Sequence, residues 1–558
     1  MKRNLIQLSG NCYDVVIVGG GIYGLCVARE AVLKGLSVAL VEKGDFGHAT
    51  SFNTLRLIHG GFRYLQSLDI SRSRRSFYEQ MIFMNIAPHL VHPMPVFIPA
   101  YGHFIRGRGM LSLALKMYDN LVRGVSHDDY LARIPRGKVI SRKECLQTFP
   151  DIDREGLTGG IIFYDCQVSD SERLVISIAK AAAGCGVDLA NYLEVIGFIK
   201  EKNRIGGVRV KDILTEDEFE IRGKFVVNTC GPWVKRILGL IHNDSTKEFH
   251  GLSKAFNLVI TRKFSNDFAI GVYSQIQNNN ASELLNKRSR FLFFTPWKNY
   301  SLIGTEHVLA DEDPDKIYVT DEEINNFLGE INQAYPQAEL GLEDVCFKYI
   351  GFLPTTISTN GSVRLATKYH IYDHGLDSSL EGLISVIGVK FTEARYVAEK
   401  VADLIFKKMG IRAPASCSDI TPVYGGRIEQ FNEFLNQESR KNQFGLSRGI
   451  MQNLIFSYGS AYTEVLKYLD QEWNSDSVNA LDFVRKAEIL YAIREEMAQK
   501  LADVLLRRTD MSTNFELNHD SIMASAKIMA KELNWNNDKI EQETNEVKTS
   551  LSFFTNYT

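Results

Sequence analysis

This sequence lacks the cysteine patterns that mark a zinc site or a disulfide framework. Its eight cysteines are spread over 558 residues, and no two of them form a C-x-x-C pair. Zinc sites and redox-active dithiols use such pairs, whereas disulfide frameworks are typical of short secreted chains. We therefore expect no metal site and reduced thiols in a cytoplasmic protein. The cysteines are Cys12, Cys26, Cys145, Cys166, Cys185, Cys230, Cys346 and Cys417.

Long apolar runs and an excess of one charge are also missing. No run of about 18 apolar residues occurs, so we expect no membrane-spanning helix, and the polar Met1–Asn11 lacks the apolar core of a secretory signal. The formal net charge of −3 gives no global indication of a nucleic-acid partner, and we expect none. The hydrophobic fraction of 45% is that of a globular protein.

A glycine-rich turn follows the first apolar run. Tyr13–Val18 predicts a strand, Gly19–Gly24 contains G-x-G-x-x-G, and a helical pattern follows before a second predicted strand, Leu36–Val41. In such a βαβ unit the first glycine permits the tight turn and the second lets a pyrophosphate approach the backbone. Free N–H groups at the start of the helix favour the phosphates. The pattern predicts a dinucleotide site, the alternative being a purely structural glycine turn.

Glu42, at the end of the second predicted strand, is placed to accept hydrogen bonds from an adenosine ribose. The fingerprint alone does not distinguish NAD from FAD.

Segments spread in order along nearly the whole chain decide between the two cofactors. Together they resemble the FAD-dependent (aerobic) glycerol-3-phosphate dehydrogenases. The segments are Ile17–Gly24, Val38–Phe46, Leu57–Leu65, Val227–Val234, Leu383–Thr392, Tyr491–Ala498 and Ala502–Thr509.

The resemblance implies an α/β (α+β) fold. It comprises a Rossmann-like FAD-binding domain of the glutathione-reductase/D-amino-acid-oxidase type, an interleaved β-sheet substrate domain and a C-terminal α-helical domain. A linker rich in proline and glycine, Ala413–Gly426, separates the last two parts. We therefore expect the interleaved domains in residues 1–426, with substrate parts at about 80–160 and 250–355, and the helical domain in residues 427–558.

The resemblance also implies an activity. An FAD-dependent dehydrogenase of this kind oxidises a CH–OH group of a small substrate, a polyol phosphate or related alcohol, by hydride transfer to flavin N5. Electrons then pass to quinone or another acceptor. Two alternatives stay open: a flavin oxidase that uses oxygen on a different alcohol or an amine, and a non-catalytic FAD-binding protein.

Site residues follow from the matching positions. Around the substrate the resemblance places His59, Arg63, Tyr64 and Lys390. A hydroxyl oxidised in this way needs a base, and the unperturbed pKa of histidine, about 6.5, suits that role; positioning the flavin is the alternative for His59. Arg63 offers a fork for a phosphate or carboxylate. The cofactor contacts are Gly19, Gly21, Ile22, Tyr23, Gly24, Glu42, Lys43, Thr50, Ser51, Leu57, His59, Gly60, Gly61, Gly231, Trp233, Gly388, Lys390, Phe391 and Thr392.

The substrate half of the pattern diverges from the family. Leu353 stands directly before Pro354, where the family has an arginine that faces the substrate. Loss of one charge-assisted hydrogen bond costs about 1.5–3 kcal/mol. Either Arg56, Arg63 or Lys254 compensates, or the substrate is different, larger and less anionic.

Residues 103–124 form a basic amphipathic stretch. Four cations alternate with apolar residues, and the family's membrane-associated members dock through this region and reduce quinone. A helix packed on the core is the alternative. The sequence thus leaves open peripheral binding at the inner face of the cytoplasmic membrane, and it leaves open a homodimer. The cations are Arg106, Arg108, Lys116 and Arg123.

Overall fold

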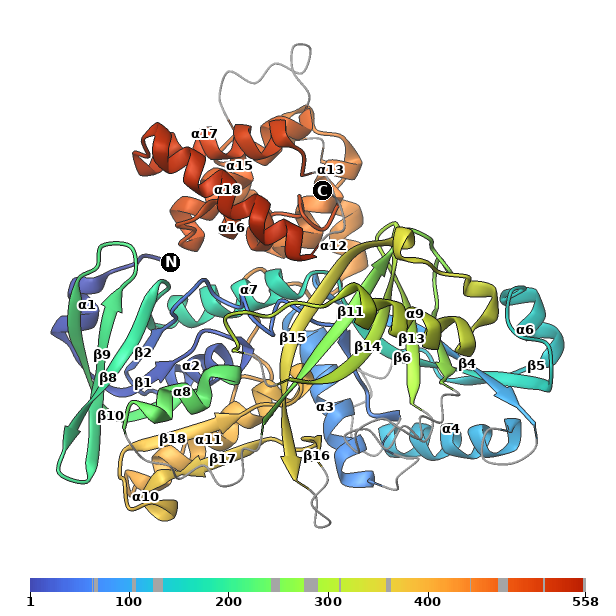
Figure 1. Cartoon of the computed structure of the whole chain (residues 1–558), viewed down its shortest axis with the longest axis horizontal. Coiled ribbons are helices and arrows are strands. Elements are labelled where there is room, and N and C mark those ends of the chain that lie inside the picture. Colours follow the sequence, from blue (N-terminus) through green and yellow to red (C-terminus); the bar gives the residue numbers. More distant parts are fainter. Residues whose placement is uncertain are drawn as a thin grey trace.

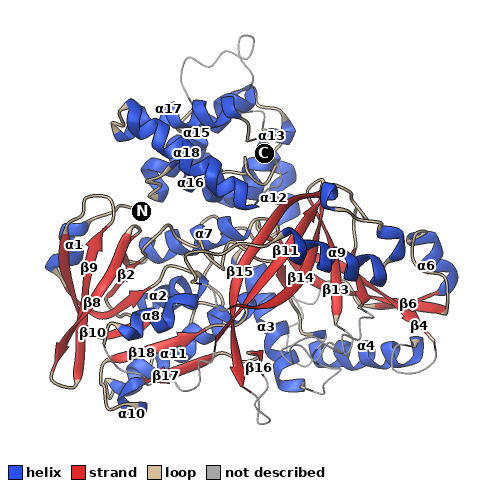
Figure 2. Ribbon diagram, viewed as in Figure 1, coloured by secondary structure: helices blue, strands red, loops and turns tan. Residues whose placement is uncertain are grey.

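The computed structural model has three parts: two β-sheets side by side and a layer of helices above them (Figure 1, Figure 2). It describes residues 1–62, 64, 69–102, 107–123, 134–241, 251–274, 290–310, 313–357, 363–441, 443–469, 480–514 and 517–554. The side chains of residues 121–123, 377, 443, 480 and 553 are not described.

The first sheet has a parallel centre. The order is β17-β18-β10-β1-β2-β7, and neighbouring strands from β18 to β7 run parallel, whereas β17 is antiparallel to β18. Two further strands, β8 and β9, continue antiparallel from β10. The bounds are β1 Cys12–Val18, β2 Val38–Val41, β7 Asp188–Ala190, β8 Leu193–Glu201, β9 Arg204–Asp212, β10 Glu218–Asn228, β17 His370–Asp373 and β18 Leu383–Ile387.

Both faces of this sheet are buried, which explains the uninterrupted apolar run in β1. Val15 and Ile17 face one apolar cluster, which residues of α2 (Ile22–Leu33), α7 (Ser171–Gly184) and α11 (Ala394–Lys408) complete. Val16 and Val18 face a second cluster, to which β8 and β9 contribute. The glycine turn after β1 is thereby held between the sheet and the start of α2.

The second sheet has the order β16-β15-β11-β14-β13-β12-β4-β6-β3, with β5 paired to β6. Its strands come from two stretches of the chain, so the two sheets are interleaved in sequence. The bounds are β3 Leu57–Ile58, β4 Val91–Tyr101, β5 Lys138–Ser141, β6 Leu157–Val168, β11 Gly251–Ile260, β12 Ala269–Tyr273, β13 Phe291–Trp297, β14 Tyr300–Ala310, β15 Val345–Ile357 and β16 Val363–Leu365. Helices α3 Ile70–Ile86, α4 Arg108–Arg123, α6 Arg142–Thr148 and α9 Asp321–Ala334 pack around it.

Beyond α11, every regular element that the structure describes is a helix. These helices form the upper layer in Figure 1, and they contact the lower part at α7 and β15. None of the helices in the described part of the chain combines the length and apolar character of a membrane span. The bounds are α12 Phe431–Glu438, α13 Arg448–Tyr458, α14 Tyr462–Leu466, α15 Ala480–Glu496, α16 Leu501–Asp503, a π-helix Val504–Arg508, α17 His519–Leu533 and α18 Asn537–Phe554.

Candidate cofactor and substrate site

A cavity of about 1050 Å³ lies where the carboxyl ends of β1, β2, β10 and β18 meet the second sheet. Ligands of open α/β sheets bind at this edge, and the volume is at the upper end of the range for such sites, roughly 300–1,000 Å³. Most of the predicted contacts line it. They are Gly19, Gly21, Ile22, Tyr23, Glu42, Lys43, Thr50, Ser51, Leu57, His59, Tyr64, Gly231, Trp233, Gly388, Lys390, Phe391 and Thr392.

Three predicted glycine contacts do not line the cavity. A Cβ on Gly24 would stand 1.9 Å from a carbonyl oxygen of the glycine turn, and one on Gly60 would stand 2.3 Å from Oη of Tyr118. Gly61 has a φ of +88°, and its Cβ would meet the backbone of α3 at 2.9 Å. These glycines allow close packing behind the cavity wall. Arg63 lies outside the residues that the structure describes.

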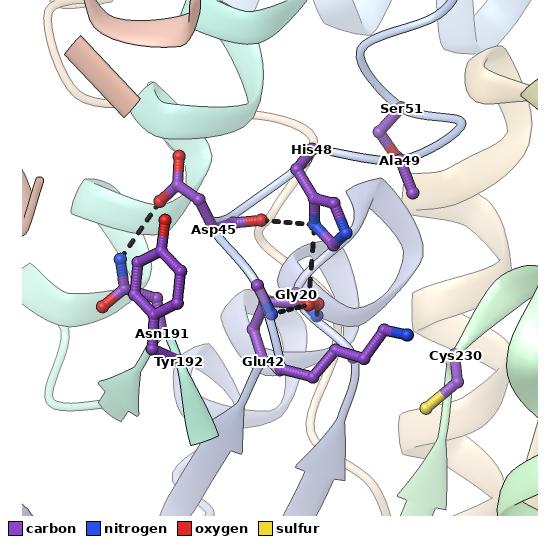
Figure 3. A network of polar contacts seen from close by, with 12 residues as sticks. Gly20, Glu42, Asp45, His48, Ala49, Ser51, Asn191, Tyr192 and Cys230 are labelled. Atoms are coloured by element: carbon purple, nitrogen blue, oxygen red, sulfur yellow. Dashed lines mark hydrogen bonds and ion pairs between the residues drawn. The ribbon is translucent and has the colours of Figure 1, made fainter. Parts of the chain in front are cut away.

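One end of the cavity is built around the carboxylate of Glu42 (Figure 3). Its Oε2 accepts a hydrogen bond from the backbone N–H of Gly20 at 2.6 Å, and its Oε1 accepts one from Gly44 at 2.8 Å. The imidazole Nδ1 of His48 lies 3.6 Å from the same Oε1. The carboxylate is therefore fixed beside the glycine turn, with only 7% of the residue exposed.

The glycine turn fits a dinucleotide. Gly19 has a φ of +105°, and a Cβ there would stand 2.9 Å from a carbonyl oxygen of Thr229, so only glycine is accommodated. At Gly21 an added Cβ would meet only Oγ of Ser51, at 3.2 Å, so the backbone is open to the cavity. That Oγ accepts a hydrogen bond from the N–H of Ile22 at the start of α2. A helix start, an open glycine and a carboxylate thus lie together, as dinucleotide binding requires.

At the other end of the cavity, a buried carboxylate holds His59. Nδ1 of His59 lies 3.0 Å from Oδ2 of Asp165, whose Oδ1 accepts from the N–H of Gly60 at 2.7 Å. The side chain of Asp165 is 5% exposed and that of His59 is 42% exposed. With Nδ1 engaged, Nε2 is the ring nitrogen left for proton transfer. Nothing in the sequence pointed to Asp165, which lies on β6.

Lys390 is held through a tyrosine of α2. Oη of Tyr23 donates to the carbonyl of Lys390 at 2.7 Å and accepts from the N–H groups of Val389 and Lys390. A Cβ on Gly388 would stand 2.2 Å from the ring of Tyr23. The absence of a side chain at Gly388 therefore makes room for this ring, and Gly388 also lines the cavity. Nζ of Lys390 contacts Oη of Tyr64.

Comparison with known proteins agrees with this geometry. A model of the FAD dependent oxidoreductase family matches residues 14–404, and a model of the C-terminal domain of alpha-glycerophosphate oxidase matches residues 416–540. A glycerol-3-phosphate dehydrogenase of Synechocystis is 31% identical over 521 residues, covering 91% of this chain and 90% of that protein. The chain belongs to the FAD-dependent oxidoreductases, in the glycerol-3-phosphate dehydrogenase family.

Further relatives extend the match to 98% of the chain. The mitochondrial glycerol-3-phosphate dehydrogenase of Bos taurus is 29% identical, with 98% of this chain and 74% of that protein covered. The crystal structure of the glycerol-3-phosphate dehydrogenase from Bacillus halodurans, complexed with FAD, superposes with a TM-score of 0.76 at 25% identity. The superposition covers 98% of this chain and 96% of the Bacillus halodurans chain. The predicted fold class and the FAD cofactor are confirmed.

The cations that line the substrate half of this dehydrogenase family member differ in part from those expected to compensate for Leu353. Leu353 lines the cavity, as do Lys390 and Arg72, and the guanidinium of Arg72 lies 4.2 Å from the centre of the Tyr64 ring.

The expectation that Arg56 or Lys254 compensates for the missing arginine is wrong. Nη1 of the buried Arg56 lies 3.0 Å from Oε2 of Glu172, and Nζ of Lys254 lies 2.9 Å from Oε1 of Glu323. Neither residue lines the cavity. Sequence reasoning missed Arg72, because nothing in its local pattern separates it from the other cations at the start of α3.

Proposed function

We propose that this chain oxidises the CH–OH group of glycerol 3-phosphate or a closely related polyol phosphate, with the predicted residues around the cavity as its site. One observation carries the proposal: a single cavity joins the glycine turn and Glu42 at one end to His59, Lys390 and Arg72 at the other. The first group suits a dinucleotide, and the second suits an anionic alcohol.

Each group at the substrate end has a chemical role. Lys390 and Arg72 bind the phosphate, which replaces the contact that Leu353 cannot make. His59 takes the hydroxyl proton at Nε2, and the carboxylate of Asp165 stabilises the imidazolium that results. FAD, when bound, would supply the acceptor for the hydride that the substrate carbon loses as the carbonyl forms.

Steady-state kinetics test the substrate. The FAD-loaded protein is assayed with an artificial electron acceptor and either glycerol 3-phosphate or glycerol. A charge-assisted contact to phosphate predicts a kcat/KM at least about tenfold higher for the phosphorylated alcohol. Equal values for both alcohols, or turnover of an amine alone, would overturn the proposal. Peroxide formed in place of acceptor reduction would identify an oxidase.

The exposed face of α4 supports peripheral membrane binding as part of the proposal. One face of the helix packs inward through Leu111 and Leu115, whereas Met110, Leu113 and Met117 are 50%, 54% and 38% exposed. Exposed Arg108 and Lys116 accompany this apolar stripe, a combination typical of helices that lie on anionic lipid. The helix lies on the opposite side of the molecule from the C-terminal layer (Figure 1). A membrane-bound quinone would then be the electron acceptor.

A further inference from the structure

Two adjacent arginines of the C-terminal layer reach into the FAD-binding half. The carboxylate of Asp45 accepts from Nε of Arg507 at 2.6 Å and from Nη1 and Nη2 of Arg508 at 2.5 and 2.7 Å. Nδ2 of Asn191 donates to the same carboxylate at 3.1 Å. The side chains of Asp45 and Arg508 are fully buried. The cluster therefore links the π-helix directly to the loop that follows β2.

The same loop carries the groups that face the cofactor. The carbonyl of Asp45 accepts from Nδ1 of His48 at 2.8 Å, and this imidazole lies 3.6 Å from Oε1 of Glu42 (Figure 3). Glu42 in turn accepts from the N–H of Gly20 in the glycine turn. A continuous chain of polar contacts thus runs from Asp45 to the backbone that approaches the pyrophosphate.

The charges of the cluster are balanced without solvent. Arg507 also donates to Asp503 at 2.7 Å, and Asp503 accepts from Oη of Tyr192 at 2.6 Å. Burial alone would raise the pKa of Asp45, but the guanidinium groups of Arg508 and Arg507 hold it below its ordinary value. Asp45 therefore stays ionised, and removal of its charge would leave two buried cations poorly compensated.

We propose that Arg507 and Arg508 are positioning residues for the cofactor. By holding Asp45 they fix the loop from Glu42 to Ser51, so FAD affinity depends on this one contact between the C-terminal layer and the FAD-binding half. Linkage requires the reverse as well, and FAD binding therefore strengthens the contact of Arg507 and Arg508 with Asp45. The inference concerns cofactor binding alone, so it stands or falls independently of the proposed substrate.

Flavin titration of the full-length apoprotein tests this coupling. Asp45→Asn and Arg508→Gln should each raise the Kd for FAD about tenfold or more, as expected for loss of a charge-assisted hydrogen bond. Their effects on log Kd should not add, because both remove the same contact. Tyr491→Phe is the matched control, since it removes an acceptor for Lys180 elsewhere in the same interface, and its Kd for FAD should stay at the wild-type value.

Thermal unfolding distinguishes positioning from plain stabilisation. A positioning role predicts that the rise in Tm on adding FAD shrinks in Asp45→Asn. An unchanged Kd and an unchanged rise in Tm, with apo and holo forms destabilised equally, would overturn the proposal. Should Asp45→Asn fail to fold, Arg508→Lys keeps the charge and loses the two-pronged contact, and it gives the same readouts.

Discussion

Nδ1 of His59 lies 3.0 Å from Oδ2 of Asp165, although 106 residues separate the two in the chain. Pairing of β3 with β6 produces this contact, because Ile58 is opposite Cys166 in the antiparallel register. A carboxylate on one ring nitrogen sets the tautomer and leaves the other to exchange a proton with the substrate.

Loss of this base should slow catalysis without releasing the cofactor. His59→Asn is expected to lower kcat by about 10²–10⁴, the range for a general base, with FAD still bound. Asp165→Asn should lower kcat less, because the imidazole remains but loses its orienting partner. Flavin content and kcat measured on the same preparations check this. A wild-type kcat in His59→Asn would assign the histidine to positioning alone.

Introducing the arginine that the family has at position 353 should improve substrate binding. Leu353→Arg adds a cation to the wall of the cavity that Arg72 and Lys390 also line, and should lower KM for glycerol 3-phosphate about tenfold. Arg72→Gln should raise KM by a similar factor. Leu353→Met controls for the change in shape. A KM that also falls in Leu353→Met, or a KM that does not fall in Leu353→Arg, would place the phosphate elsewhere.

The exposed stripe of α4 should govern membrane binding. Replacing Met110 and Leu113 by serine removes exposed apolar surface without touching the packed face, and should reduce sedimentation with anionic vesicles several-fold. Ile6→Ser, at a residue 86% exposed on α1 (Leu5–Gly10), is the matched control. Equal sedimentation of all three proteins would argue against α4 as the docking surface.

A buried histidine should make stability fall in mild acid. His89 is fully buried, and burial together with Arg173 and His92 lowers its pKa to about 3. The unfolded chain therefore takes up the proton first, near its ordinary pKa of about 6.5, and stability is lost as pH falls below that value. The loss should approach about 1.4 kcal/mol per pH unit.

Replacement of His89 by leucine should remove this part of the pH dependence. Both ring nitrogens lack a hydrogen-bond partner among the described residues, so little is lost at neutral pH. Urea unfolding between about pH 6.5 and 5 should show a loss about 1.6 kcal/mol smaller in His89→Leu than in the wild type. Equal slopes for the two proteins would mean that His89 is not the group responsible.

The cofactor half was predictable because its chemistry is local. The turn Gly19–Gly24 and the carboxylate of Glu42 belong to one βαβ unit, whose spacing dictates where they meet. Gly60 and Gly61 are also adjacent glycines, but sequence alone could not show whether they contact the ligand or allow close packing behind the cavity wall.

The substrate half required the folded chain. Asp165 reaches His59 only through strand pairing, and burial of Arg56 and Lys254 in ion pairs is a tertiary property that no local pattern reports. The predicted division at residues 426 and 427 stays a prediction. Asp45 shows the same limit, because its arginine partners lie 462 and 463 residues away.

The most direct measurement mixes the FAD-loaded protein with glycerol 3-phosphate in the absence of oxygen and follows the visible absorbance of the flavin. Oxidation of the alcohol at this site predicts rapid bleaching with glycerol 3-phosphate, slow bleaching in His59→Asn and little with glycerol at the same concentration. A flavin that stays oxidised at saturating glycerol 3-phosphate would contradict the proposed function.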